Sequence, residues 1–165
     1  MKLAMPPQTI LIAAGPDRVW DVITKAELGD EWRNANCISD WQAGSSIAIT
    51  ATIGTKRYRD KGEVLRADKP WLLQHSYWSR ISGLADVPEN YSMITLTLKA
   101  ENAHTLLTVE QDMPRSPPRR GNGWETGEDS GLKHWQFYWR MALPVLKRIA
   151  EQGSPVDPVM RAQSR

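Results

Sequence analysis

Residues 132–149, LKHWQFYWRMALPVLKRI, have the pattern of a long amphipathic helix. Apolar side chains recur there at intervals of three and four residues, which places them along one side of an α-helix. These residues are Leu132, Trp135, Trp139, Leu143 or Ala142, Leu146 and Ile149. A helix of about 20 residues is roughly 30 Å long at 1.5 Å per residue. Its apolar side needs an equally long apolar surface to pack against.

The middle of the chain provides that surface as a series of β-strands. Ile47, Ile49, Ala51 and Ile53 alternate with small or hydroxylated residues, which is the period-two pattern of a strand with two distinct faces. Four further strands are predicted, over residues 56–66, 71–79, 91–99 and 105–111. Successive strands joined by short turns form an antiparallel meander.

The first part of the chain adds a strand and two short helices. An apolar run predicts the strand over residues 8–14, and Pro16 begins the first helix, where its missing N–H is not needed. The second helix is predicted over 26–32. The order β-α-α-β5-α predicts an α+β fold, in which a curved antiparallel sheet of about six strands wraps around the long C-terminal helix.

The length of 165 residues fits one domain. We assign residues 1–151 to this domain and predict that residues 152–165 form a flexible tail, because they have little apolar surface to bury. Residues 113–131 are rich in Pro, Gly and charged side chains, which predicts a long mobile loop before the last helix.

Composition argues against several classes of protein. The 21 basic and 19 acidic residues leave a net charge of +2, which gives no case for nucleic-acid binding. No apolar stretch reaches the ~18 residues that suggest a membrane span. Cys37 is the only cysteine and no signal peptide is evident, so we expect a cytoplasmic protein. The three histidines lie far apart and no dinucleotide-binding motif occurs, so we expect neither a metal nor a cofactor.

A cavity between the sheet and the last helix is the predicted functional site. Inward side chains of the strands, with the helix residues turned toward them, make an apolar lining with a few polar groups, as ligand sites usually have. The candidates are Ile49, Ala51, Tyr58, Asp60, His75, Tyr77, Leu96, Val109, Trp135 and Trp139. Eight of the 13 aromatic residues are Trp, and these side chains either line such a cavity or fill it.

Three of these candidates carry the chemistry. Asp60 beside His75 would fix the tautomer of the imidazole and support proton transfer, with Tyr77 as a third polar group. The alternative is a structural hydrogen-bonded pair, or an Asp60 side chain that points to water. Buried polar groups need partners whether or not they do chemistry, so both alternatives stay open.

Several short motifs, taken in order, resemble the AHSA1 family, named after the activator of Hsp90 ATPase homologue 1, of the START-like or Bet v 1-like (SRPBCC) superfamily. The matching residues are Val19–Thr24 (VWDVIT), Trp32, Trp41–Ser45 (WQAGS), Lys61–Leu65 (KGEVL), Lys69–Pro70, Leu73, Ser76–Tyr77, Pro88–Tyr91 (PENY), Thr105–Gln111 (TLLTVEQ), Trp135 and Leu146–Lys147. The resemblance spans roughly residues 8–151 and implies the helix-grip fold. Proteins of this superfamily include lipid carriers, hormone-binding proteins and polyketide cyclases.

We therefore expect the chain to bind a hydrophobic or amphipathic, lipid-like small molecule between the sheet and the C-terminal helix. One alternative is an enzyme like a polyketide cyclase or aromatase, in which the same polar groups move protons. Another is a chaperone or regulatory partner protein related to the Hsp90 activators. Fold alone does not choose among these functions.

Overall fold

The computed structural model describes residues 2–115 and 130–152. Within them, one seven-stranded antiparallel sheet has the order β1-β7-β6-β5-β4-β3-β2. The strands are β1 (Lys2–Ile12), β2 (Asn36–Ile38), β3 (Ser46–Ile53), β4 (Lys56–Asp68), β5 (Leu72–Tyr77), β6 (Ser92–Glu101) and β7 (His104–Pro114). The helices are α1 (Pro16–Thr24), α2 (Ala26–Arg33) and α3 (Ser130–Gln152), and two 3-10 turns, η1 (Arg80–Ser82) and η2 (Pro88–Asn90), follow β5.

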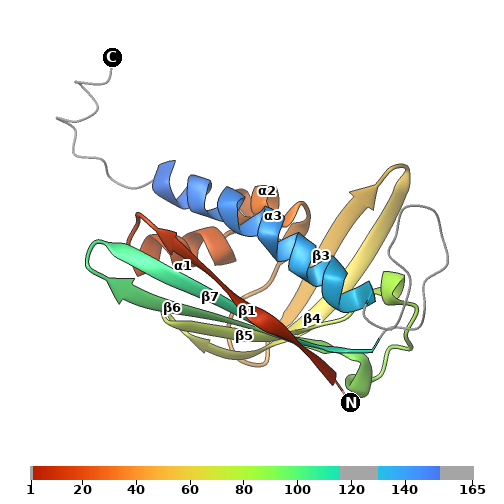
Figure 1. Ribbon diagram of the computed structural model, residues 1–165. Helices are drawn as coiled ribbons and strands as arrows, with labels where there is room; N and C mark the ends of the chain where they lie inside the picture. Colours follow the sequence, from red (N-terminus) through yellow and green to blue (C-terminus); the bar gives the residue numbers. More distant parts are fainter. Residues whose placement is uncertain (1, 116–129, 153–165) are drawn as a thin grey trace.

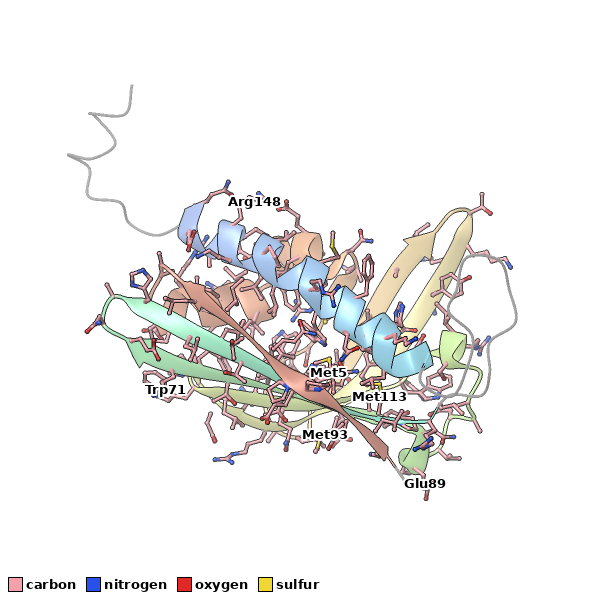
Figure 2. All side chains as sticks on the ribbon, in the orientation of Figure 1. Met5, Trp71, Glu89, Met93, Met113 and Arg148 are labelled. Atoms are coloured by element: carbon pink, nitrogen blue, oxygen red, sulfur yellow. The ribbon has the colours of Figure 1, made fainter. Side chains whose placement is uncertain are left out.

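Helix α3 lies across one face of the curved sheet, which confirms the predicted α+β helix-grip fold (Figure 1). Its buried side chains Trp139, Leu143 and Leu146 belong to one core with inward residues of the sheet such as Leu96 and Leu107. Met5 and Met113, from the neighbouring strands β1 and β7, are buried in the same core (Figure 2).

The sheet has seven strands where about six were predicted, because β2 lies in a segment for which no strand was predicted. Three residues are too few to show a period-two pattern. Strand β2 is identified by its pairing, in which Cys37 lies opposite Ile49. Strand β1 also begins earlier than predicted, at Lys2, and its register shifts between Met5 and Gln8, where two prolines cannot donate to the ladder.

The two segments predicted to be mobile lie largely outside the described residues. Of the loop predicted over 113–131, residues 113 and 114 belong to β7 and residues 130 and 131 to α3, while 116–129 lie outside the described residues. Helix α3 continues to Gln152, and the tail from 153 to 165 also lies outside them. Among the helices that the structure describes, none combines the length and apolar character needed to cross a membrane.

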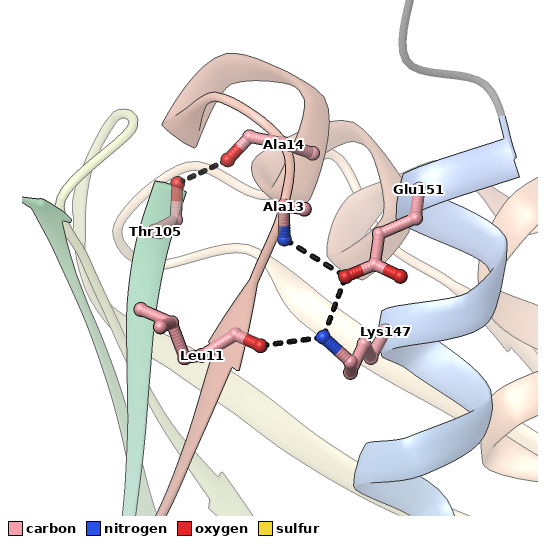
Figure 3. A network of polar contacts seen from close by, with 6 residues as sticks. All are labelled: Leu11, Ala13, Ala14, Thr105, Lys147 and Glu151. Carbon is pink, nitrogen blue, oxygen red and sulfur yellow. Dashed lines mark hydrogen bonds and ion pairs between the residues drawn. The ribbon is translucent and has the colours of Figure 1, made fainter. Parts of the chain in front are cut away.

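Polar contacts fix the C-terminal end of α3 to the chain between β1 and α1 (Figure 3). The Lys147 ammonium donates to the carbonyl of Leu11 over 2.8 Å, and the Glu151 carboxylate accepts from the N–H of Ala13 over 2.9 Å. Lys147 and Glu151 also pair with each other at 2.6 Å. The backbone groups that β1 leaves unpaired at its end are satisfied in this way.

Strand β4 changes partner at its middle, and this divides the sheet into two parts. Residues up to Glu63 pair with β3 and those from Val64 onward pair with β5, while Lys61 also exchanges two backbone hydrogen bonds with Trp78, just beyond β5. At the change, a Cβ atom on Gly62 would lie 2.0 Å from the Ser76 carbonyl oxygen, a separation that real Cβ atoms do not show. Only glycine therefore allows β4 to pass this close to the end of β5. Beyond this point the β3–β4 hairpin lies beside α3 (Figure 1).

A side chain at position 62 is expected to destabilise the fold. Gly62→Ser should lower the free energy of unfolding by about 1–3 kcal/mol or more, because the Ser76 backbone must move to accept it. Chemical denaturation measures this. The control is Gly15→Ser, since Gly15 is the N-cap residue of α1, an added Cβ there has nothing within 4 Å, and serine is favoured at this position. Equal stability of the two variants would contradict the close approach.

Candidate functional site

A cavity of about 560 Å³ lies between α3, the β3–β4 hairpin, β5 and the end of α2. This size falls within the roughly 300–1,000 Å³ range of small-molecule sites. The cavity reaches the surface, because five of its lining residues are exposed: Glu31, Asn34, Thr52, Phe137 and Met141. We call this opening the cavity mouth. It lies between the end of α2, strand β3 and the outer side of α3.

The structure brings nine of the ten candidate residues to this cavity: Ile49, Ala51, Tyr58, Asp60, His75, Tyr77, Leu96, Trp135 and Trp139. Val109 is not among the lining residues. It faces inward as its parity predicted, but it is fully buried in the core. The alternation of side chains along the strands thus identified the inward face of the sheet. It could not tell which inward side chains pack in the core and which line the cavity.

Aromatic rings form a continuous wall along the α3 side of the cavity. Tyr77 of β5 meets Trp135 edge to face, with ring centroids 5.1 Å apart. Trp135 then contacts Tyr138 at 5.2 Å, and Tyr138 contacts Trp139 at 5.1 Å. Trp139 in turn lies 6.1 Å from Trp32 of α2. Edge-to-face contacts of this kind are favourable beyond the area they bury, so they support the wall around the open space.

Asp60 and Tyr77 form a hydrogen-bonded pair at the cavity. The Tyr77 hydroxyl donates to Asp60 Oδ2 over 2.5 Å. Burial, reinforced by the negative charge of Asp60, raises the pKa of Tyr77 well above 10, so the phenol keeps its proton. The other oxygen, Asp60 Oδ1, is buried and has no hydrogen-bond partner among the described residues. A buried acceptor without a donor is costly, which makes this oxygen a place where a donor would be stabilised.

The imidazole of His75 is neutral at physiological pH. Burial lowers its pKa to about 4. Nδ1 lies 2.9 Å from the carbonyl of Ser76, an acceptor, so we assign the ring proton to Nδ1 and a free lone pair to Nε2. The carboxylate–imidazole pair considered for Asp60 and His75 does not form, because Asp60 is bonded to Tyr77 and the ring is oriented by its own strand.

Arg33 lines the cavity and was missed by reasoning from strands alone. It ends α2, where its Nη2 donates to the carbonyl of Ile23 at the end of α1. Its guanidinium carbon lies 4.2 Å from the ring centroid of Trp32 and 5.3 Å from that of Trp41. Burial lowers the pKa of Arg33. The signal available in the sequence was a basic residue in the last turn of a short helix, directly after Trp32.

The loop after β5 also contributes lining residues that the sequence analysis did not select, among them Ser79, Ile81 and Leu84. The strand predicted over 71–79 ends at Tyr77, so Ser79 lies beyond it, and Ile81 and Leu84 come from a segment where no periodicity predicts the direction of a side chain. In the part of the chain that the structure describes, no group of three or more His, Cys, Asp or Glu side chains is placed to hold a metal ion.

The depressed pKa of His75 predicts that stability falls in acid. Above pH 6.5 the ring is neutral in both states, whereas between pH 6.5 and about 4 the unfolded chain takes up a proton that the folded protein does not. The folded protein should lose about 3 kcal/mol through this group across that window. Unfolding measured against pH should show a flatter profile for His75→Gln than for the wild type. Identical slopes for the two proteins would contradict the assignment.

Comparison with known proteins agrees with this architecture. The chain matches the family model "Activator of Hsp90 ATPase homolog 1-like protein" over residues 13–151. No match was found among curated proteins. The solved structure of ChR145 from Cytophaga hutchinsonii is 29% identical, with a TM-score of 0.70 over 91% of this chain and 94% of that one.

Two more distant structures share the fold. CalU16 from Micromonospora echinospora is 20% identical, with a TM-score of 0.64 over 99% of this chain and 90% of that one. An HSP90 activator from Plasmodium falciparum is 18% identical, with a TM-score of 0.63 over 90% of this chain and 95% of that one. Because the family model covers most of the sequence and the fold agrees, the chain belongs to the activator of Hsp90 ATPase homolog 1-like (AHSA1) family.

Proposed function

We propose that this protein binds a hydrophobic or amphipathic small molecule in the cavity between α3 and the β3–β4 hairpin. The observation that carries the proposal is the open space of about 560 Å³ among aromatic and aliphatic side chains. A core that served stability alone would fill this space, since interiors pack at the density of organic crystals. The mouth gives a ligand a route from the surface.

The polar groups at the cavity favour a molecule with one polar end. Among the described residues, Asp60 Oδ1 lacks a donor, and the neutral ring of His75 carries a lone pair on Nε2. Two buried donors at the cavity, Arg33 Nη1 and Trp78 Nε1, also lack partners there. A hydroxyl on an otherwise apolar ligand both donates and accepts, so it would suit this set of groups. The Trp135 and Tyr138 rings supply flat apolar area for the rest of the molecule.

The acid–base alternative receives less support from these contacts. An enzyme of the cyclase type needs a convergent pair that moves a proton, and here Asp60 is paired with a phenol whose pKa lies well above 10. His75 is held by a backbone carbonyl and stays neutral. A role as a chaperone partner is suggested by the family and by the HSP90 activator from Plasmodium falciparum, but it does not require an open cavity.

The proposal is tested first on the purified protein. Native mass spectrometry, followed by denaturing extraction, identifies any apolar molecule that stays bound. The apo protein is then titrated with N-phenyl-1-naphthylamine, a neutral apolar fluorophore that brightens in dry sites. We expect saturable binding with quenching of tryptophan emission, because tryptophans line the cavity.

A matched pair of variants on β3 locates the binding. Ala51 lines the cavity and Ala48 is exposed on the other face of the same strand. Ala51→Phe fills the space and should weaken probe binding at least about tenfold, while Ala48→Phe leaves it unchanged. Loss of binding in both variants, or in neither, would contradict the cavity as the site.

A further inference from the structure

Two large apolar side chains are exposed to solvent at the cavity mouth. Phe137 and Met141 are 59% and 58% exposed, and both also line the cavity. They lie one turn apart on α3, so they are neighbours on its outer side. The exposed apolar residues Leu65 and Trp71 lie on other elements and do not line the cavity, and Trp71 lies at the opposite side of the sheet from α3 (Figure 2).

The helix that carries this pair is basic on its outer side. Its exposed charged residues are Lys133, Arg140 and Arg148, and no acidic residue occurs between positions 130 and 150. Arg148 points away from the sheet (Figure 2) and pairs with Glu31, the acidic residue at the mouth. Arg140 therefore lies between the two apolar residues along the helix, while the charge of Arg148 is offset by Glu31.

The hairpin on the other side of the mouth has the same sign of charge. Lys56 lies at its tip, next to the turn at Gly54 and Thr55, and Arg57 and Arg59 are exposed on its outer face. The only carboxylate between residues 46 and 62 is Asp60, which faces the cavity and bonds to Tyr77. The α3 and hairpin edges of the mouth thus carry Arg140 and Lys56, while Arg57 and Arg59 lie on the hairpin face turned away from the cavity and the α2 edge carries Glu31.

From this arrangement we infer that the mouth docks on the surface of an anionic lipid bilayer, with Phe137 and Met141 entering the headgroup region and basic side chains contacting lipid phosphates. Exposed apolar side chains beside Lys and Arg are what interfacial helices use for this purpose. Anionic lipids attract each nearby basic residue by about 1 kcal/mol, equivalent to roughly fivefold in affinity. Docked in this way, the cavity would open onto the bilayer, so that an apolar molecule could enter or leave without crossing water.

The geometry favours a lipid surface over an acidic protein. A stable protein interface buries about 800 Å² on each partner, with a packed apolar centre. Here the apolar centre is two side chains around the opening of a cavity, which suits a fluid surface more than a rigid one. The inference does not depend on the identity of the ligand, because vesicle binding and probe binding are measured separately and either can fail alone.

Vesicle flotation with the full-length protein tests the inference. We expect the wild type to float with vesicles of phosphatidylcholine and phosphatidylglycerol in equal parts, to remain unbound with pure phosphatidylcholine, and to be released by high salt. Arg140→Glu should weaken binding at least about fivefold. The double variant F137S/M141S should weaken it by about tenfold, since it removes the apolar anchor.

Two exposed residues away from the mouth provide controls. Lys99→Glu matches the charge reversal and L65S matches the loss of an exposed apolar side chain, and both should bind as the wild type does. Circular dichroism confirms that each variant is folded. Failure of the wild type to bind anionic vesicles at low salt overturns the inference and favours an acidic protein partner. An equal loss in control and mouth variants also overturns it, because binding would then reflect overall charge.

Discussion

The backbone of β4 passes the carbonyl of Ser76 so closely that position 62 has no room for a side chain. Around this point the main pairing of the strand passes from β3 to β5, and the two parts of the sheet meet at an angle (Figure 1). Were β4 straight, the β3–β4 hairpin would continue the sheet beneath α3 and its inward side chains would pack in the core. Instead the hairpin stands beside the helix, and the space between them remains open.

An open space of this kind needs walls that do not collapse into it. The rings of Tyr77, Trp135 and Tyr138 meet edge to face, and each holds its neighbour in position. The Tyr77 hydroxyl is bonded to Asp60 across β4 and β5, so the hairpin and the helix are linked through one aromatic side chain. Stability and an open cavity are therefore compatible here, because the aromatic residues bury their edges against one another and leave other surfaces free.

The sequence was sufficient for the architecture and for the inward face of most strands, because period-two and three-to-four patterns report directly on burial. The sequence was insufficient for segments that carry no periodic pattern of apolar residues. Strand β2 has three residues, and Arg33 lies at the end of a helix, so neither belonged to a periodic series. The partner of Asp60 could not be chosen either, since His75 and Tyr77 lie on the same face of β5 and only the three-dimensional distance separates them.

The two halves of α3 are anchored unequally. Its C-terminal part is held by Lys147 and Glu151, and Arg18 donates to the carbonyls of Ile149 and Ala150. Its N-terminal part packs on aromatic rings and has two hydrogen bonds to the sheet, from the Gln8 side chain to the carbonyl of Gln136 over 3.2 Å and from Trp139 Nε1 to Gln111 Oε1 over 2.8 Å. Pro144, which has no N–H for the carbonyl of Arg140, lies between the two parts. A displacement of the N-terminal part at Pro144 would therefore change the volume of the cavity at the cost of ring contacts and these two hydrogen bonds, while the hydrogen bonds between the strands stay in place.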